Sequence, residues 1–259
     1  MPDFRKELKF AKETAVAAGD ILLKGLKTKR RVHYKGRVDL VTQFDLKAEK
    51  YIVGKIGKAF PRHSILAEEG GGSDNHSDYK WIIDPLDGTT NFAHGYPAFC
   101  VSIGLEVEGR MMLGAIYNPV LDELFYASKG KGAFLNRRRI HVSEERKLSH
   151  SLLATGFPYD IADTYIDNLD NFARMYKASR GIRRAGSAAL DLCYLACGRF
   201  DGFWELKLHA WDTAAGIIIV SEAGGRITDL HGGQYSIYDN SILATNGKIH
   251  NQMQKVLVG

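Results

Sequence analysis

The sequence predicts an α+β protein built from two halves. Residues 4–25 carry apolar side chains at the spacing of one helix face. Residues 98–107 and 110–118 have strand character and are joined at Glu108-Gly109, as in a hairpin. Beyond about residue 150, short strand-like runs alternate with helical stretches. These observations predict paired helices on a mostly antiparallel sheet, followed by a unit in which strands and helices alternate.

The first half is expected to begin with two helices and a strand. The first helix is predicted over residues 4–25. A second should begin near Thr42 and Asp45, because both residues favour a helix start, and Pro61 should end it. Residues 64–67 are apolar and predict a strand. Residues 122–128 and 133–142 continue the β-rich pattern.

The stretch 81–92, with the sequence WIIDPLDGTTNF, is the main candidate for chemistry. It begins as a buried strand that should stop near Asp84, because Pro85 cannot donate to a ladder. Asp84 and Asp87 are then expected on a tight loop, where two close carboxylates repel unless a cation lies between them. Mg²⁺ prefers such oxygen ligands. Residues 88–90 should open a short helix whose N–H groups face an anion. The alternative for the short string DPLDG is a surface turn.

The second half is predicted as a series of short elements. Ser187 is a good N-cap for an apolar helix through residue 196, and Asp212 falls in the first turn of another helix that Gly224-Gly225 stops. The remaining predicted strands are 151–156, 201–206, 227–230 and 241–245, and the remaining predicted helices are 161–176 and 249–256.

Composition limits the class of protein. Of the 259 residues, 45% are hydrophobic, which is ample for a core, and no apolar stretch reaches membrane-spanning length. Three cysteines and the lack of an N-terminal apolar run predict a reducing, cytoplasmic setting. The net charge is +5, with basic clusters at residues 27–31 and 137–139. We interpret both clusters as solvated turns or helix ends; the alternative is attraction of anionic partners, nucleic acid included.

Two motifs resemble those of the inositol monophosphatase family of metal-dependent phosphatases. They are WIIDPLDGTTNF at 81–92 and WDTAAGIIIVSEAGG at 211–225, and the acidic pair Glu68-Glu69 follows another apolar strand. The resemblance covers nearly the whole chain. It implies a layered α-β-α-β-α sandwich of the sugar-phosphatase type. It also implies a single domain over residues 1–259, with halves of about 1–148 and 149–259.

The resemblance further implies two or three Mg²⁺ ions per subunit. Glu68, Asp84 and the Leu86 carbonyl would hold the first ion with Thr89. The second would be held by Asp84, Asp87 and Asp212, and Glu68 with Asp45 would complete a weak third site. Thr89 and Glu68, with Asp45, would orient or deprotonate the attacking water. The residues that carry these implied roles are Asp45, Glu68, Asp84, Leu86, Asp87, Thr89 and Asp212.

The substrate side is also implied by the resemblance. The N–H groups of Gly88 and Thr89 would hold the phosphate, and Asp212 would also bind the substrate. The turn Gly186-Ser187-Ala188 resembles the family's polyol-binding turn, and Glu205 matches an acid that binds an inositol hydroxyl. Lys35 resembles the family's mobile-loop lysine.

The function implied is Mg²⁺-dependent, lithium-sensitive hydrolysis of myo-inositol 1-phosphate by a homodimer. Close relatives act as fructose-1,6-bisphosphatases or histidinol-phosphatases, and both stay open as alternatives. A hypothesis from another functional class is that the protein is a transcription antitermination factor that binds the transcription machinery or RNA. Residues 155–158 and 186–192 resemble the bacterial branch in which that role occurs. The complete set of metal ligands favours catalysis.

Overall fold

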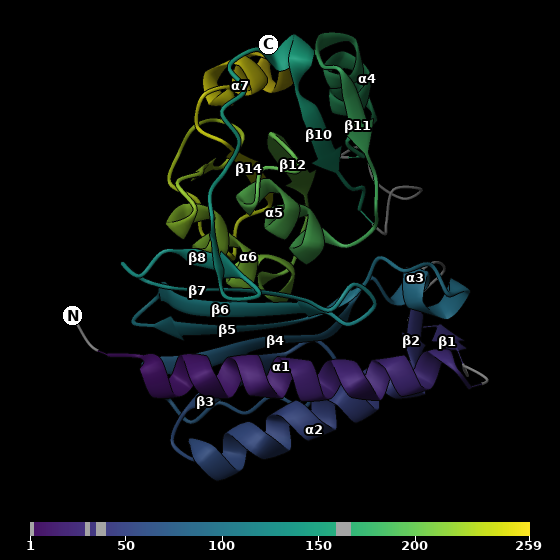
Figure 1. Ribbon diagram of the computed structural model, residues 1–259, viewed down its shortest axis with the longest axis vertical. Helices are drawn as coiled ribbons and strands as arrows, with labels where there is room; N and C mark the ends of the chain where they lie inside the picture. The colour runs from purple at the N-terminus through teal and green to yellow at the C-terminus, as the bar shows by residue number, and fades with distance from the viewer. Residues whose placement is uncertain (1–2, 29–31, 35–39, 159–166) are drawn as a thin grey trace.

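The computed structural model describes residues 3–28, 32–34, 40–158 and 167–259, and it stacks them in five layers (Figure 1). A helix pair covers one face of a seven-stranded sheet, a second helix pair lies between the two sheets, and a third covers the five-stranded sheet. The predicted α-β-α-β-α sandwich is therefore confirmed. The helix pairs are α1 (Arg5–Leu26) with α2 (Gln43–Ala59), α5 (Ala188–Ala196) with α6 (Ala210–Glu222), and α4 (Leu169–Ala178) with α7 (His250–Val258).

The larger sheet follows chain order and is antiparallel except for its first pair of strands. Its strands are β3 (Ser64–Ala67), β4 (Tyr79–Asp87), β5 (Cys100–Val107), β6 (Arg110–Asn118), β7 (Glu123–Ser128), β8 (Ala133–Leu135) and β9 (Arg138–Ile140). The strands of the smaller sheet, in spatial order, are β11 (Gly181–Arg183), β10 (Leu152–Thr155), β12 (Gly202–Leu206), β14 (Ser241–Thr245) and β13 (Arg226–Thr228). The sheet is mixed, because β10 is parallel to both of its neighbours whereas β14 is antiparallel to both of its own.

Most predicted elements are present, and the differences are local. The run 133–142 is split into β8 and β9 by Asn136 and Arg137, whose φ angles of 45° and 72° reverse the chain. The helix predicted over 161–176 begins at Leu169, and residues 161–166 lie outside the described part of the chain. The short strands β1 (Val32–Tyr34), β2 (Leu40–Thr42) and β11 were not predicted, because three residues are too few for a period to be recognised.

Strand β4 corrects the prediction made for the central motif. It does not stop at Asp84 but continues to Asp87, which pairs with Cys100 on β5. The register shifts between Asp84 and Asp87, so Pro85 falls in an irregularity where its missing N–H breaks no regular ladder. The bulge keeps both carboxylates beside a rigid strand rather than on a free loop. Helix α3 (Thr89–His94) follows as predicted, after Gly88 at φ 93°.

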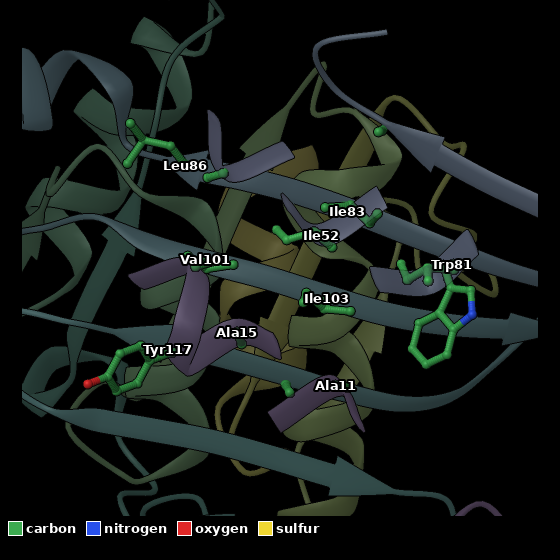
Figure 2. Close-up of a cluster of buried hydrophobic side chains, with 14 of the residues drawn as sticks. Ala11, Ala15, Ile52, Trp81, Ile83, Leu86, Val101, Ile103 and Tyr117 are labelled. Carbon is green, nitrogen blue, oxygen red and sulfur yellow. The ribbon is translucent and has the colours of Figure 1, made fainter. Parts of the chain in front are cut away.

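The first hydrophobic core lies between helices α1 and α2 and the larger sheet (Figure 2). The small Ala11 and Ala15 of α1 pack against β5 and β6, and Ile52 of α2 packs toward Ile83 of β4. Because this packing covers the face of β4 that is turned toward the helices, it makes the strand rigid and fixes the residues at its end.

A second core lies between the two sheets and contains side chains from both halves. Cys100 and Ile116 of the larger sheet belong to the same cluster as Leu190 of α5 and Ile219 of α6. Cys193 lies fully buried in this cluster and Cys197 packs against it. Because the halves share this core, we infer that they fold as one domain.

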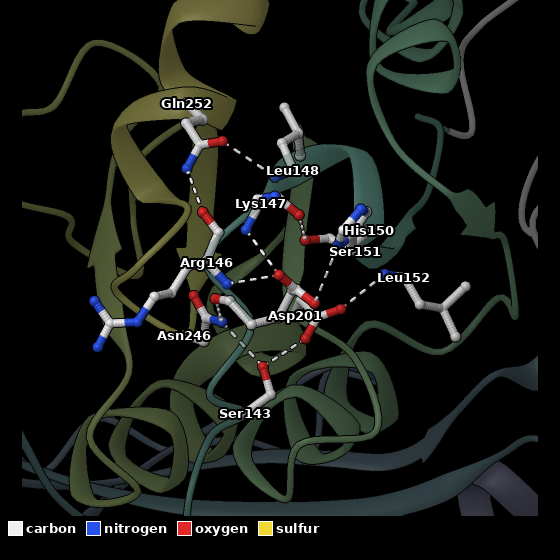
Figure 3. Close-up of polar contacts among 11 residues, drawn as sticks. Ser143, Arg146, Lys147, Leu148, His150, Ser151, Leu152, Asp201, Asn246 and Gln252 are labelled. Carbon is white, nitrogen blue, oxygen red and sulfur yellow. Dashed lines mark hydrogen bonds and ion pairs between the residues drawn. The ribbon is translucent and has the colours of Figure 1, made fainter.

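A polar junction attaches the connection between the halves to the smaller sheet (Figure 3). Asp201 accepts hydrogen bonds from Ser143 Oγ and from Leu152 N at 2.7 Å. Asn246 donates to Ser143 Oγ at 2.9 Å, and Gln252 of α7 accepts from Leu148 N at 3.1 Å. Among the described helices, none combines the length and apolar character needed to cross a membrane.

Candidate active site

A continuous hydrogen-bonded chain links the start of α2 to the end of β4. Thr42 caps α2, and its N–H and hydroxyl both donate to Asp45 Oδ2. The other oxygen of Asp45 lies 3.0 Å from Thr89 Oγ1, which is also 3.0 Å from the Leu86 carbonyl oxygen. The single hydroxyl proton of Thr89 can serve only one of these acceptors at a time. Thr89 therefore has a lone pair available for a further donor.

Asp84 lies on β4, and Glu68 directly follows the neighbouring strand β3. The N–H of Leu86 donates to Asp84 Oδ1 at 2.9 Å, which fixes the carboxylate beside the bulge. Glu68 follows β3 in a turn, its N–H donates to the Ile83 carbonyl, and its carboxyl acts on Asp84 through charge and hydrogen bonding. These acids therefore meet because β3 and β4 are parallel and Ala67 pairs with Ile83, so the next residue of each chain segment is Glu68 or Asp84.

The turn after β3 is held by Glu49 of α2, a residue that sequence reasoning missed. Its buried carboxylate accepts from the N–H of Glu69 at 2.7 Å and of Gly71 at 2.8 Å. A Cβ at residue 71 would press on Glu49 Oε1, so Gly71 lets the turn approach this carboxylate without displacing it. Glu49 lies one helical turn after Asp45, and it thereby positions the turn that carries Glu68.

Asp87 joins the two halves of the protein at the site. Its Oδ2 accepts from Ser187 Oγ at 2.6 Å and from Ala189 N at 2.8 Å, both at the start of α5. Asn91 of α3 makes a second connection, donating to the carbonyls of Ala98 at 2.6 Å and Ala185 at 2.7 Å. The first-half motif is therefore attached to the second-half turn by side-chain hydrogen bonds.

Asp212 lies in the first turn of α6. It accepts from His209 N at 2.6 Å, the reciprocal bond of a helix start. Asp212 and Asp87 line the same cavity, and the charge of Asp87 raises the pKa of Asp212 beyond the effect of burial.

A cavity of about 320 Å³ opens beside Asp87 and Asp212. Gly186, Ser187 and Ala188 form one wall, and Glu205 of β12 forms another. Asp45, Glu68, Asp84 and Thr89 do not line this cavity but lie next to it, through their contacts with the end of β4. Other lining residues are Thr90, Asn91, Thr155, Gly156, Phe157, Pro158, Arg184, Asp191 and Leu208.

Burial and mutual repulsion dominate the electrostatics of the site. Burial raises the pKa of Asp84 well above its usual range, and the charges of Glu68, Asp87 and Asp212 raise it further. Burial likewise raises the pKa of Asp212 and brings that of Asp87 to about 6, although hydrogen bonds from Ser187 and Ala189 oppose the shift at Asp87. Burial also raises the pKa of Glu205 to about 8. The site is thus a cluster of acidic groups that repel one another.

This donor set fits a divalent cation. Carboxylate and main-chain carbonyl oxygens are the ligands of Mg²⁺, and a cation would offset the repulsion that raises these pKa values. In the described ranges no group of three or more His, Cys, Asp or Glu side chains is arranged so that it could hold a metal ion by itself. Mg²⁺ usually keeps several waters and takes other oxygens from a substrate phosphate.

The structure thus brings together the predicted site residues that it describes. Lys35 lies outside the described part of the chain. Sequence reasoning missed Glu49, Asn91, Arg184 and Asp191 as parts of the site. Asn91 and Asp191 stood within the motifs at 81–92 and 186–192, so their position was a usable signal, whereas nothing local distinguished Glu49 from an ordinary helix-surface acid.

Comparison with known proteins gives one consistent result. The family model described as the inositol monophosphatase family matches residues 3–258. An inositol-1-monophosphatase of Synechocystis sp. is 45% identical over 257 residues, which cover 98% of this chain and 90% of the relative. A protein of Pseudomonas aeruginosa named Nus factor SuhB is 45% identical over 250 residues, covering 93% of this chain and 92% of the relative.

The solved structures agree with the sequence comparisons. The inositol monophosphatase of Anabaena (Nostoc) sp. superimposes with a TM-score of 0.91 at 45% identity, covering 99% of this chain and 96% of that one. The likeness therefore spans nearly the whole of both chains.

Proposed function

Because this chain belongs to the inositol monophosphatase family, we propose that it hydrolyses myo-inositol 1-phosphate to inositol and phosphate with Mg²⁺ as cofactor. The chain is a phosphatase of phosphate monoesters, as its family and relatives are. The observation that supports the substrate most directly is the adjacency of two environments: a cluster of carboxylates, and a cavity with polar walls next to it.

The carboxylate cluster supplies the proposed metal ligands. Glu68, Asp84 and the Leu86 carbonyl would hold one ion together with Thr89, and Asp84, Asp87 and Asp212 a second. Asp45 with Glu68 would hold a weaker third. When bound, Mg²⁺ neutralises the phosphate oxygens, lowers the pKa of a coordinated water and stabilises the leaving oxygen.

The protein's own groups orient the nucleophile. Thr89 Oγ1 lies between Asp45 and the Leu86 carbonyl, so its hydroxyl can donate to Asp45 while accepting a hydrogen bond from water. Burial raises the pKa of Asp45, which makes its carboxylate a better acceptor for a proton passed through Thr89. Glu68 is the second group proposed to take up the water's proton. No covalent enzyme intermediate is required.

Substrate binding is divided between the two halves. We assign the phosphate to the N–H groups of Gly88 and Thr89, which begin α3 directly after β4. The Gly186–Ala188 turn, Glu205 and Asp212 would contact the polyol. A Cβ at Gly156 would overlap the Glu205 carboxyl, so the glycine leaves the room that Glu205 occupies in the wall.

A phosphate-release panel tests the proposed substrate. Inositol 1-phosphate, fructose 1,6-bisphosphate and histidinol phosphate are compared with and without Mg²⁺. We expect the highest kcat/KM on inositol 1-phosphate. A higher value on either of the others would overturn the proposed substrate. Hydrolysis of none of them would favour the second candidate, association with the transcription machinery, which the name of the Pseudomonas relative suggests.

Replacing Glu205 should affect binding more than turnover. We expect Glu205→Ala to raise KM for inositol 1-phosphate about tenfold and to lower kcat less, because it removes a hydrogen-bonding group for polyol hydroxyls. Since the pKa of Glu205 is raised to about 8, the neutral amide of Glu205→Gln is a close mimic near neutral pH and should retain most of the affinity. Steady-state kinetics on inositol 1-phosphate and an aryl phosphate give the comparison. Equal losses on both substrates would instead assign Glu205 to the metal site or the fold.

We also propose that the protein is a homodimer, as the family resemblance implies. The expected result is a dimer mass by analytical ultracentrifugation at micromolar concentration. A monomer mass under those conditions would contradict it.

A further inference from the structure

Asp191 is a buried acid in the cavity wall, and the proposed mechanism assigns it no role. It lies in the first turn of α5, is 1% exposed and lines the cavity. Its Oδ1 has no hydrogen-bond partner within the described part of the chain. A buried polar atom without a partner is costly, so native proteins rarely keep one unless a ligand or water satisfies it.

Asp191 lines the same cavity as the turn that we propose to bind the polyol. Ser187 and Ala188 precede it by four and three residues, so all three lie on one face of the helix. The Ser187 hydroxyl donates a hydrogen bond to Asp87, whereas Asp191 Oδ1 accepts none from the described residues. Burial raises the pKa of Asp191, and the charges of Glu205 and Asp87, which line the same cavity, raise it further.

We propose that Asp191 contacts a hydroxyl group of the substrate and determines specificity for polyol phosphates. The inference rests on the proposed function and deepens it. A hydroxyl both donates and accepts, so it can satisfy a carboxyl in either protonation state. Glu205 on β12 and Asp191 on α5 then contact the polyol from two elements of the second half. A second phosphate on a substrate would lie near both acids, although Arg184 supplies a positive charge to the same lining.

The test combines variants of Asp191 with substrates that lack single hydroxyls. We expect Asp191→Ala to raise KM for inositol 1-phosphate about five- to tenfold with kcat within about twofold, and to leave KM for an aryl phosphate unchanged. Asp191→Asn, which keeps a donor and an acceptor, should retain most of the affinity. One monodeoxy analogue of inositol 1-phosphate should bind wild type more weakly but show no further loss with Asp191→Ala, because the contact is already missing.

The outcomes separate the two proposals. Failure of wild type to hydrolyse inositol 1-phosphate overturns the proposed function itself. Hydrolysis by wild type, with equal KM changes on both substrates or with no analogue coupled to residue 191, overturns the role of Asp191 alone. Thermal unfolding confirms that each variant is folded. If Asp191→Ala does not fold, Asp191→Leu fills the space with an apolar side chain and allows the same comparison. Preference for fructose 1,6-bisphosphate in Asp191→Ala would show that the residue excludes a second phosphate, which also supports the specificity role.

Discussion

Asp87→Asn is expected to lower kcat by about 10²–10³-fold or more, because it removes a charged oxygen from the centre of the site. The charge of Asp87 acts on both Asp84 and Asp212, and its Oδ2 is fixed by Ser187 and Ala189. An asparagine oxygen can accept both of these hydrogen bonds, so the geometry should survive while the charge is lost. Phosphate release under saturating Mg²⁺ measures the effect.

The stability of this variant provides the control. Replacing a buried carboxylate with an amide removes repulsion from Asp84 and Asp212, so without metal the thermal midpoint should be unchanged or higher. Asp170→Asn, an exposed substitution in the first turn of α4, should change neither activity nor midpoint. If Asp87→Asn turns over substrate at nearly the wild-type rate, Asp87 only joins the two halves of the protein.

Removing metal should abolish turnover completely. We expect excess EDTA to stop phosphate release, Mg²⁺ to restore it, and Ca²⁺ not to, because Ca²⁺ takes about six to eight ligands at longer distances than Mg²⁺. Full activity in excess chelator would contradict the role assigned to the carboxylates.

The same experiment has a readout that does not depend on activity. Mg²⁺ should raise the thermal midpoint, because it binds the folded carboxylate cluster and not the unfolded chain. The pKa of Asp87 is raised from 3.8 to about 6, so this group destabilises the metal-free protein as pH rises through that window. The increase in midpoint caused by Mg²⁺ should therefore be larger at about pH 7.5 than at about pH 5. An equal increase at both values would mean that Mg²⁺ binds elsewhere.

Local features of this chain could be predicted from the sequence because their causes lie within a few residues. Thr42 and Asp45 cap α2 through the reciprocal bonds that their spacing allows, and the Ser187 hydroxyl caps α5 by accepting from Leu190 N. The family motifs placed the acids of the site, although Pro85 made the end of β4 seem earlier than it is. The apolar spacing in α1 likewise identified the face that packs on the sheet.

Only the tertiary structure could decide how these pieces meet. Asp87 bonds to Ser187 100 residues away, Thr89 to Asp45 44 residues away, and Asn91 to Ala185 94 residues away. No periodicity or turn signal encodes such contacts, because they arise from the packing of the halves around their shared core. The same packing leaves Asp191 buried beside the cavity with an oxygen that no described group satisfies. The sequence by itself therefore determined the family and the acids, and the fold decided which of those acids meet at the end of β4 and which line the cavity.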